Sequence, residues 1–589
     1  MPTSEQQFVD SADGVRIAVY EDGNPDGPTV VLVHGFPDSH VLWDGVVPLL
    51  AERFRIIRYD NRGVGLSSAP KAVSAYAMAR FADDFAAVTA ELSPGAPVHV
   101  LAHDWGSVGI WEYLKRPGAG DRVASFTSVS GPSQDQLVEY IFSGLRQPWR
   151  PRRFARSVSQ ALRFTYMALL SIPVLAPLVL RLLLSVPALR RNAVDNIADE
   201  LIHHSPTLAA DAARSIKTYP ANYFRAFSRR REAPGIIDVP VQLIVNTRDK
   251  FVRPYGYDET GRWVPRLWRR DIRAGHFSPM SHPQVMAAAV HEFADLADGR
   301  EPSRALLRAQ VGRPRGSFGD TLVSVTGAGS GIGRETAIAF AREGAELVIS
   351  DIDEAAVKAT AAEIVTRGGV AHAYVLDVSD ADAVEAYAEQ VSTEHGVPDI
   401  VVNNAGIGQA GRFLDTPAEQ FDRVLDVNLG GMVNGCRSFG RRLVERGTGG
   451  YIVNVSSMAA YAPFQSLNAY CTSKAATYMF SDCLRAELDA ADVGLTTICP
   501  GVIDTNIINT TRFDAPAGKQ SKQVDGRRGQ LGKMFALRHY GPDKVANAIL
   551  SSVKKKKPIR PVAPEAYALY GLSRVAPQGL RNAARMRVI

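Results

Sequence analysis

The stretch Leu101-Ala102-His103-Asp104-Trp105-Gly106-Ser107 follows an apolar run and decides the fold of the first half of this chain. A sharp strand-to-helix turn needs small residues on both flanks, here Ala102 and Gly106, and it exposes the side chain at its tip. That side chain is Asp104, a carboxylate rather than a serine or cysteine. A carboxylate nucleophile forms an ester with an alkyl carbon, such as that of an epoxide or a halide, which activated water must then hydrolyse.

The partners that such a nucleophile needs follow it in the chain. His276 is the candidate base, and Asp249 is the candidate carboxylate that orients it. The order nucleophile, acid, histidine is that of the α/β-hydrolases. The backbone N–H groups of Phe36 and Trp105 are the expected oxyanion donors. Apolar runs that alternate with helical stretches predict a mostly parallel sheet with reactive groups at the strand ends. These runs are Thr29–Val33, Arg55–Tyr59, Val98–Ala102, Val241–Val245 and Arg270–Arg273.

Together with the Asp104 elbow and the Asp249–His276 pair, the motif His34-Gly35-Phe36-Pro37 resembles epoxide hydrolases of the α/β-hydrolase fold. The resemblance covers about residues 5–297. It implies a lid domain, at about residues 132–235, whose tyrosines donate hydrogen bonds to the epoxide oxygen.

Tyr223, in Asn222-Tyr223-Phe224-Arg225, matches the better marked of these lid tyrosines, and Tyr140 and Tyr166 are both candidates for the second. A haloalkane dehalogenase is the nearest alternative, because that family also has an Asp–Trp elbow. It normally has Asn, which helps to hold halide, where this chain has Phe36, so Phe36 and Tyr223 favour the epoxide. A hydrolase domain that only binds or delivers lipid is a further alternative, although no triad member is missing.

The lid segment has an unusual charge distribution. Between Glu139 and Asp195 there are nine arginines and no acidic residue, and Phe164–Leu180 is seventeen residues without a charge. Two prolines within that run argue against a helix that spans a membrane. We expect either a buried lid core that lines an apolar substrate tunnel or an interfacial segment whose arginines meet anionic lipid.

A second signature, Thr326-Gly327-Ala328-Gly329-Ser330-Gly331-Ile332-Gly333, lies between an expected strand, Thr321–Val325, and a long helix. Glycines let the backbone approach a pyrophosphate, and the helix N-terminus favours its charge. Asp351 ends the next strand, where an acid holds both ribose hydroxyls and repels a 2′-phosphate. Ile352, rather than an arginine, follows it, so the sequence predicts NAD in preference to NADP.

Tyr470 and Lys474 stand at i and i+4 and therefore share one helix face. A lysine there favours the tyrosinate and so suits Tyr470 to proton transfer with a hydroxyl. With Asn403-Asn404-Ala405-Gly406, Asn428, Ser456-Ser457 and Pro500-Gly501, this pair resembles the short-chain dehydrogenases/reductases over about residues 317–555.

That resemblance implies that Ser457 is the active serine and that Asn428 supports a proton relay through water. It assigns the adenine to Asp377 and Val378, the ribose to Asn404, the nicotinamide carboxamide to Thr505, and substrate choice to residues 506–535. The implied cofactor-binding residues are Gly327, Ser330, Gly331, Ile332, Gly333, Asp351, Asp377, Val378, Asn404, Ala405, Gly406, Tyr470, Lys474, Pro500, Gly501 and Thr505.

The chain is too long for one core, and its length alone suggests about three or four units. The chain has 589 residues, 46% of them hydrophobic, and a net charge of +6. Its four cysteines show no C-x-x-C spacing, which indicates neither disulfides nor a metal site and favours the cytoplasm. No nucleic-acid motif accompanies the basic stretches. We expect an α/β-hydrolase fold over 1–297, a linker over 298–320, a Rossmann-type doubly wound parallel sheet over 321–553 and a basic tail over 554–589.

As a whole, the chain resembles fusions of an epoxide hydrolase with a short-chain dehydrogenase in mycobacteria and related actinobacteria. The resemblance implies a bifunctional lipid enzyme that opens a lipophilic, fatty-acyl epoxide to a diol and interconverts a secondary alcohol and a ketone with NAD. It also implies a homo-oligomer formed through the dehydrogenase domain, and peripheral contact with anionic membrane is expected from the basic, apolar lid.

Overall fold

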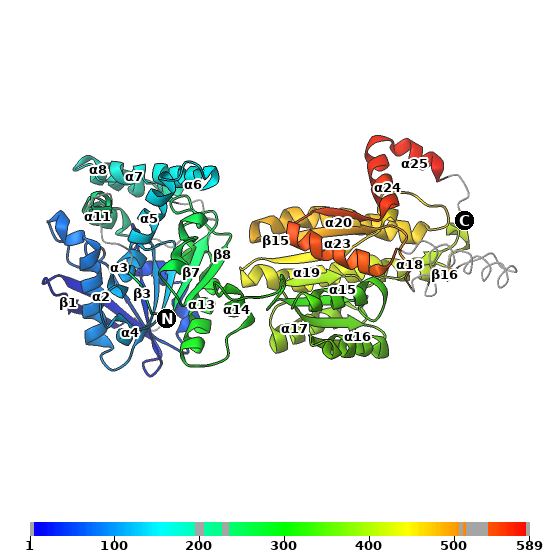
Figure 1. The fold of residues 1–589 in the computed structure, drawn as a ribbon, viewed down its shortest axis with the longest axis horizontal. Helices are drawn as coiled ribbons and strands as arrows, with labels where there is room; N and C mark the ends of the chain where they lie inside the picture. The colour runs from blue at the N-terminus through cyan, green and yellow to red at the C-terminus, as the bar shows by residue number, and fades with distance from the viewer. Residues whose placement is uncertain (1–4, 195–204, 227–234, 506–510, 514–539, 585–589) are drawn as a thin grey trace. The chain divides into compact units, whose positions relative to one another are not determined.

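The computed structural model describes residues 5–194, 205–226, 235–505, 511–513 and 540–584 (Figure 1). The chain divides into two compact units, Met1–Arg313 and Pro314–Ile589. Each unit has its own sheet and its own apolar core, so each is described by itself.

An eight-stranded sheet forms the centre of the first unit, in the order β1-β2-β4-β3-β5-β6-β7-β8. β2 is antiparallel to both β1 and β4, and the remaining neighbours are parallel. The strands are β1 (Glu5–Asp10), β2 (Arg16–Gly23), β3 (Thr29–Val33), β4 (Arg55–Tyr59), β5 (Val98–His103), β6 (Val123–Val129), β7 (Val241–Asn246) and β8 (Leu267–Ile272). β8 begins three residues before the predicted run Arg270–Arg273, because its charged residues mask the strand in the sequence.

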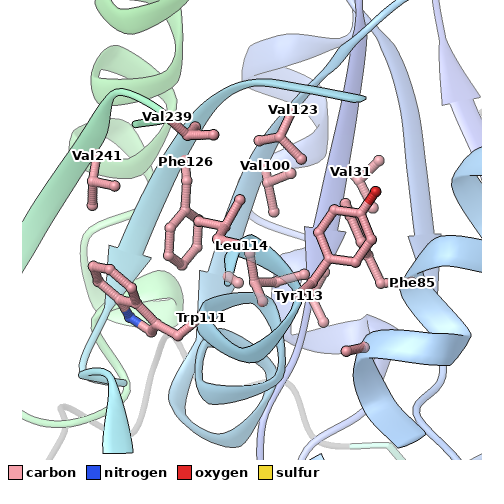
Figure 2. Close-up of a cluster of buried hydrophobic side chains, with 14 of the residues drawn as sticks. Val31, Phe85, Val100, Trp111, Tyr113, Leu114, Val123, Phe126, Val239 and Val241 are labelled. Atoms are coloured by element: carbon pink, nitrogen blue, oxygen red, sulfur yellow. The ribbon is translucent and has the colours of Figure 1, made fainter. Parts of the chain in front are cut away.

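Helices cover both faces of this sheet. They are α1 (Val47–Leu50), α2 (Met78–Leu92), α3 (Asp104–Leu114), α4 (Ala119–Arg122), α12 (Ser278–Ser281), α13 (Pro283–Ala297) and α14 (Arg304–Ala309). The core under α3 is visible in Figure 2, where Trp111 and Leu114 lie against Phe126 and Val100 of the strands. This packing fixes α3, and with it the turn that carries Asp104.

A helical insert between β6 and β7 forms the lid. Its helices are α5 (Gln134–Leu145), α6 (Pro151–Arg163), α7 (Thr165–Leu170), α8 (Leu175–Ser185), α9 (Pro187–Val194), α10 (Leu208–Ser215) and α11 (Thr218–Ala226). In Figure 1, α6, α7 and α8 lie in one row, and α5 and α11 lie between that row and the sheet. No single helix among the described residues is long and apolar enough to cross a membrane.

The segment predicted as a linker is partly folded into the first unit. Arg304–Ala309 forms α14, which Ser303 caps by accepting a hydrogen bond from the Leu306 N–H. Leu306 is fully buried against Trp268 and Phe293. Arginines around a single buried leucine hid this short helix in the sequence.

Seven parallel strands form the sheet of the second unit, in the order β11-β10-β9-β12-β14-β15-β17. They are β9 (Leu322–Thr326), β10 (Glu346–Asp351), β11 (Val370–Val375), β12 (Ile400–Asn403), β14 (Gly450–Val455), β15 (Val493–Pro500) and β17 (Ile559–Val562). A separate pair joins β13 (Gln409–Ala410) to β16 (Arg512–Phe513), and these last residues lie in the one part of the predicted substrate loop that the structure describes.

The helices of this unit enclose two separate apolar clusters, one on each face of the sheet, as a doubly wound fold requires. They are α15 (Gly331–Arg342), α16 (Glu354–Thr366), α17 (Ala381–His395), α18 (Ala418–Leu425), α19 (Gly431–Arg446), α20 (Asn468–Leu488), α23 (Pro542–Lys555), α24 (Pro564–Val575) and α25 (Pro577–Ala583). The fold class predicted for both halves is confirmed.

The predicted basic tail contains part of this fold. Lys554 and Lys555 end α23, where cations suit the helix dipole, and Ile559–Val562 is strand β17 beside β15. A strand of four residues that includes Arg560 and Pro561 shows no apolar run, so no sequence pattern marks it.

Candidate active sites

Asp104 stands at the start of α3, directly after β5, and its φ of +47° lies in the left-handed region. This conformation is strained for any residue other than glycine, and such strain is typical of functional turns. A Cβ at Gly106 would lie 2.2 Å from the His34 carbonyl oxygen, so only glycine fits there. The turn therefore holds the Asp104 carboxylate at the strand end, as the elbow motif predicts.

The predicted triad comes together from three strand ends. His276 Nδ1 lies 2.9 Å from Asp249 Oδ2, and His276 Nε2 lies 3.6 Å from Asp104 Oδ1. The other oxygen of Asp249 accepts hydrogen bonds from the backbone N–H groups of Phe251, at 2.7 Å, and Val252, at 3.1 Å. Asp249 is thus fixed by its own loop and in turn orients the imidazole.

The charges of the three buried triad residues determine one another's pKa values. Burial lowers the pKa of His276, but the carboxylates of Asp249 and Asp104 outweigh it and raise that pKa to about 10. Burial also works against ionised Asp104 and Asp249, yet contacts with His276 hold both carboxyl pKa values below their usual range. The free site therefore carries an imidazolium between two carboxylates.

The predicted oxyanion donors flank the nucleophile. The Phe36 N–H donates to Asp104 Oδ2 at 2.9 Å, and the Phe36–Pro37 peptide is cis. The N–H of Trp105 belongs to the first turn of α3, where N–H groups lack an acceptor within the helix. Both groups can therefore serve an oxygen that develops negative charge on the Asp104 carboxyl.

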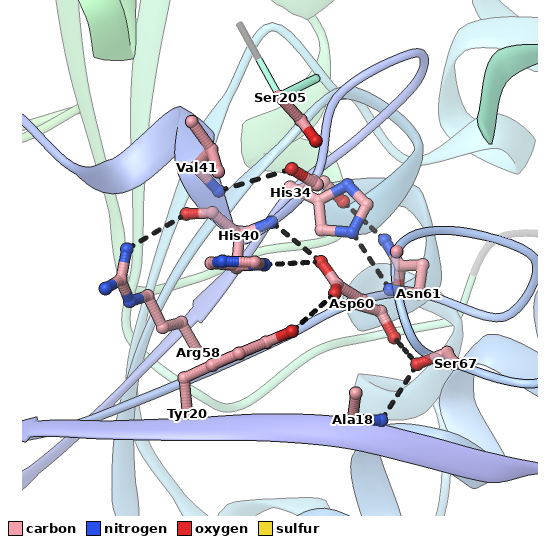
Figure 3. A network of polar contacts seen from close by, with 12 residues as sticks. Ala18, Tyr20, His34, His40, Val41, Arg58, Asp60, Asn61, Ser67 and Ser205 are labelled. Atoms are coloured by element: carbon pink, nitrogen blue, oxygen red, sulfur yellow. Dashed lines mark hydrogen bonds and ion pairs between the residues drawn. The ribbon is translucent and has the colours of Figure 1, made fainter. Parts of the chain in front are cut away.

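A polar network holds the loop that carries Phe36 (Figure 3). The Asn61 N–H donates to His34 Nε2 at 2.9 Å, and the Asn61 side-chain amide donates to the His34 carbonyl at 2.6 Å. Beside them, Asp60 accepts from the His40 N–H at 3.0 Å and from the Tyr20 hydroxyl at 3.1 Å. The oxyanion loop is thus tied to the end of β4 by hydrogen bonds from buried groups.

Two lid tyrosines lie above the nucleophile. The ring of Tyr219, on α11, lies 5.5 Å from that of Trp105 and 5.0 Å from that of Phe36, measured between centroids. Tyr166, on α7, is hydrogen-bonded to Tyr219. Burial and the negative charge of Asp104 raise the pKa of both phenols, so both stay protonated.

The structure therefore places Tyr219, not the predicted Tyr223, against the elbow. Tyr223 lies one turn further along α11 and packs, partly buried, at the edge of the same apolar cluster. Of the two candidates for the second tyrosine, Tyr140 has its ring centroid 6.2 Å from that of Tyr255 and lies under the guanidinium of Arg153. Tyr166 is the candidate that contacts Tyr219 and is affected by the charge of Asp104. Tyr219 and Tyr223 are four residues apart and therefore share one face of α11. This spacing could have identified Tyr219 as a second candidate, but the motif around Tyr223 did not include it.

In the second unit, the glycine motif joins β9 to α15. A Cβ at Gly327, whose φ is +65°, would lie 2.8 Å from the Ala405 Cα. The Asn404 amide donates to the carbonyls of Thr326, at 3.0 Å, and Gly327, at 3.1 Å, so it supports this loop. Ser330 is the N-cap of α15 and makes no side-chain capping bond there.

The helix N-terminus, the close loop and an acid at the end of β10 together fit a nicotinamide dinucleotide. Asp351 Oδ2 accepts from the Gly329 N–H at 2.8 Å, which places the carboxylate beside the loop. Thr505 lies across the loop, 3.5 Å from the position of a Cβ on Gly331. Gly333 instead packs its α-carbon against the Gly327 carbonyl, and this close contact shapes the glycine loop. Ile332 is partly buried at the edge of the apolar core below the loop.

The remaining predicted cofactor residues lie at neighbouring strand ends. Asp377 accepts from the Ser379 N–H at 3.0 Å and from its hydroxyl at 2.6 Å, and the buried Val378 packs on Gly431. The Ala405 N–H donates to Thr326 Oγ1 at 3.2 Å. Pro500 ends β15, and the Gly501 N–H donates to the Val562 carbonyl at 2.8 Å.

Four predicted catalytic residues meet behind the glycine loop. Burial raises the pKa of Tyr470, whose hydroxyl is hydrogen-bonded to Ser457. Lys474 Nζ donates to the Val455 carbonyl at 3.1 Å, and burial lowers its pKa to about 8. The ammonium lies 5.8 Å from the Tyr470 ring centroid. Ser456 instead donates to the Lys474 carbonyl at 2.8 Å, which is a structural role.

Asn428 lies in a π-helical turn, Asp426–Gly430, between α18 and α19. Its Oδ1 accepts from the Ile407 N–H at 2.8 Å, and its Nδ2 donates to the Ile407 carbonyl at 3.0 Å and to Ser473 Oγ at 3.1 Å. A Cβ at Gly406 would lie 3.0 Å from Asn428 Oδ1 and 3.4 Å from Lys474 Nζ. A π-turn of this kind often marks a functional position, and here it holds Asn428 beside the lysine.

Among the described residues, one further cluster of side chains has the spacing that ligands of a cation would need. Glu346, His372 and His395 offer ligand atoms within 4.8 Å of one another. His372 Nε2 lies 3.1 Å from Glu346 Oε1, and His395 Nε2 lies 2.7 Å from the Tyr374 hydroxyl. These hydrogen bonds account for the arrangement, and we assign no ion to it.

Comparison with known proteins covers both units. The family model described as alpha/beta hydrolase fold matches residues 28–283, and that described as short chain dehydrogenase matches residues 321–515. "Probable oxidoreductase EphD" of Mycobacterium tuberculosis is 80% identical over 593 residues, which covers 100% of both chains.

Two further relatives match the second unit. "C alpha-dehydrogenase" of Sphingobium is 30% identical and covers 40% of this chain and 78% of its own. A short chain dehydrogenase/reductase of Burkholderia phymatum, solved in complex with NAD, is 25% identical, covers 45% of this chain and 96% of its own, and has a TM-score of 0.42. The match over the whole length decides the assignment: the chain belongs to the family of mycobacterial EphD oxidoreductases, in which an alpha/beta hydrolase domain is fused to a short chain dehydrogenase domain that takes a nicotinamide cofactor.

Proposed function

We propose that the first unit hydrolyses a lipophilic epoxide to a diol through an ester on Asp104, and that the second unit interconverts a secondary alcohol and a ketone with NAD. The observation that carries the first part is the pair Tyr166 and Tyr219, protonated and buried above a carboxylate nucleophile. Two phenol donors suit an epoxide oxygen, which must gain a proton as the ring opens. A halide needs no such proton, so the pair favours the epoxide over the halide.

Ring opening begins at Asp104. One carboxylate oxygen bonds to an epoxide carbon, the carbon–oxygen bond of the ring breaks, and a tyrosine hydroxyl protonates the released oxygen. The imidazolium of His276 restores that proton to the tyrosine, through solvent, and becomes neutral. The result is an ester of Asp104 with a neighbouring hydroxyl group.

Hydrolysis of this ester uses the rest of the triad. Neutral His276, held by Asp249 at 2.9 Å, takes a proton from water as the hydroxide bonds to the ester carbonyl carbon. The N–H groups of Phe36 and Trp105 stabilise the oxyanion. Collapse releases the diol, which takes the carboxyl proton, and returns the Asp104 carboxylate and the His276 imidazolium.

In the second unit, bound NAD supplies a hydride acceptor or donor. Tyr470 exchanges the proton of the alcohol, Ser457 holds the substrate oxygen beside it, and the Lys474 charge favours the tyrosinate. Asp351 supports NAD rather than NADP, because a carboxylate at the end of β10 repels a 2′-phosphate.

A single-turnover experiment in ¹⁸O-labelled water tests the ester. With excess enzyme and an epoxidised long-chain fatty acid, the first turnover should place the label in the Asp104 carboxyl and not in the diol. His276→Gln should trap the ester, seen as an added mass on the peptide that contains Asp104. Label in the diol during the first turnover contradicts the ester.

The dehydrogenase proposal has its own assay. NADH should form when diol and NAD are supplied, and Tyr470→Phe should abolish it without changing diol formation. If Asp104→Asn leaves diol formation intact, the first unit does not open the epoxide through an ester on Asp104.

A further inference from the structure

We propose that the outer face of the lid helices α7 and α8 docks on an anionic lipid bilayer. We define the outer lid face by its exposed aliphatic side chains, which are Leu169, Ile172, Val174, Leu175, Leu178, Val179 and Leu182. The proposal rests on this face and its charge, and it stands whether or not the proposed epoxide chemistry is correct.

Helix α8 is apolar on two opposite sides. Leu175, Leu178 and Leu182 are 56%, 62% and 63% exposed, and with Val179 they follow the spacing i, i+3, i+4, i+7 of one helix stripe. The opposite stripe, with Ala176 and Leu184, is buried against the unit. A helix that is hydrophobic all round normally lies inside a protein or a membrane. The outer stripe of α8 therefore requires an apolar partner outside the unit.

The turn before α8 extends the same face. Leu169 is exposed on α7, and Ile172 and Val174 are exposed in the turn, where Val174 is 73% accessible with a φ of +66°. A β-branched residue at positive φ is unusual, and here it presents an apolar side chain to the exterior. Contiguous apolar patches of this kind on a protein surface mark interaction sites.

The geometry points to a helix that lies in the membrane interface rather than one that crosses it. α6–α7 and α8 pass the length and hydropathy criteria for a span only as a pair, and the pair is bent by 99°. In Figure 1 they lie in one row at the outside of the lid. Amphipathic segments that lie flat insert their apolar side to the level of the acyl boundary and leave cations among the headgroups.

Charge decides between a bilayer and a second copy of this chain. Arg181 is exposed on α8, Arg150 and Arg152 are exposed at the start of the neighbouring lid helix α6, and no acidic residue occurs between Glu139 and Asp195. Two copies that met through this face would bring like charges together. Anionic headgroups complement the same arginines, and each is expected to strengthen binding about fivefold.

The same helices connect this face to the candidate nucleophile. Both Tyr166, which is buried and lies within reach of the Asp104 charge, and the exposed Leu169 belong to the short helix α7. Docking through the outer lid face would therefore hold the lid of the first unit against the membrane, where lipophilic molecules partition.

Flotation with vesicles tests the proposal on the full chain. The probes are vesicles of phosphatidylglycerol and phosphatidylcholine in equal parts, and vesicles of phosphatidylcholine alone. We expect the wild type to float with the first at low salt and to be largely released at high salt. The triple variant Leu175→Gln/Leu178→Gln/Leu182→Gln should lower the partition coefficient at least about tenfold, and Arg150→Gln/Arg152→Gln/Arg181→Gln should lower it about 100-fold on anionic vesicles only.

A matched control removes exposed apolar side chains elsewhere. Leu49→Gln/Val365→Gln/Leu414→Gln should bind vesicles as the wild type does. Hydrogen–deuterium exchange on the unmodified wild type needs no variant: anionic vesicles should protect peptides from residues 165–185. Any one of three results overturns the proposal: the wild type does not float at low salt, the leucine variant floats as well as the wild type, or protection is confined to other segments. A wild-type dimer that the leucine variant dissociates, without vesicle binding, overturns it in favour of a contact between copies.

Discussion

Replacement of Tyr219 by phenylalanine isolates one of the two hydroxyls above Asp104. This hydroxyl is buried and hydrogen-bonded to Tyr166 and to the Trp105 side chain, and the substitution removes nothing else. Loss of one preorganised donor from a site of developing charge costs about 2.7–4 kcal/mol, or about 100- to 1000-fold in kcat. Because Tyr166 keeps its own hydroxyl, we expect a loss near 100-fold. The free energy of unfolding should fall by only about 1 kcal/mol, the worth of one hydrogen bond.

The assay is single-turnover diol formation from an epoxidised fatty acid, with thermal unfolding measured in parallel. Tyr223→Phe is the matched control, because it makes the same change one turn along the same helix. We expect Tyr223→Phe to stay within twofold of the wild type, and Tyr166→Phe to resemble Tyr219→Phe. A loss of more than tenfold in Tyr223→Phe with near-normal Tyr219→Phe would refute the assignment.

Three further predictions follow from the charges in the two sites. Asp104→Asn should move the pKa of His276 from about 10 toward its ordinary value, and an unchanged midpoint in an NMR titration of the imidazole would contradict the electrostatic account. Burial lowers the pKa of Lys474 to about 8, whereas the unfolded lysine has a pKa of about 10.4. Between these two pH values the unfolded chain binds more protons than the folded one. The contribution of Lys474 therefore makes the second unit more stable as the pH rises through this window. Lys474→Met should remove that dependence and abolish NADH formation, as thermal unfolding at several pH values and a coupled assay can show. Asp351→Ser/Ile352→Arg should shift the ratio of kcat/KM toward NADP at least about tenfold, and no shift would mean that Asp351 does not read the ribose.

The sequence located the parallel strands β3, β4, β5, β7, β9 and β10 as apolar runs, but it did not locate the parallel strands β6, β11, β12, β14, β15 and β17. Strands such as Thr29–Val33 and Val241–Asn246 are buried on both faces and therefore read as continuous apolar runs. β1 and β2 form the antiparallel edge of their sheet; β1 has only two apolar residues, Phe8 and Val9, and the short apolar run 17–20 of β2 was not among the predicted strands. The short elements α14 and β17 each depend on a few buried groups among charged or proline residues, and only packing reveals them.

Within the sites, residues fixed by chain order were easier to predict than residues supplied by the lid. Asp104, Asp249 and His276 follow strand ends, and a parallel sheet brings those ends together. Tyr219 and Tyr223 share one face of α11, and Tyr219 is the one whose ring lies 5.5 Å from that of Trp105. The placement of α11 depends on its packing against α5 and α7, which are distant from it in the sequence.

The two carboxylates around His276 have a consequence for the order of events in catalysis. While both are ionised, the imidazole holds its proton and cannot activate water. An ester on Asp104 cancels one of these charges, so the same histidine gives up its proton more readily once substrate is attached. In the proposed mechanism, His276 therefore becomes able to activate water only after the ester on Asp104 has formed, and the free enzyme does not generate hydroxide in its site.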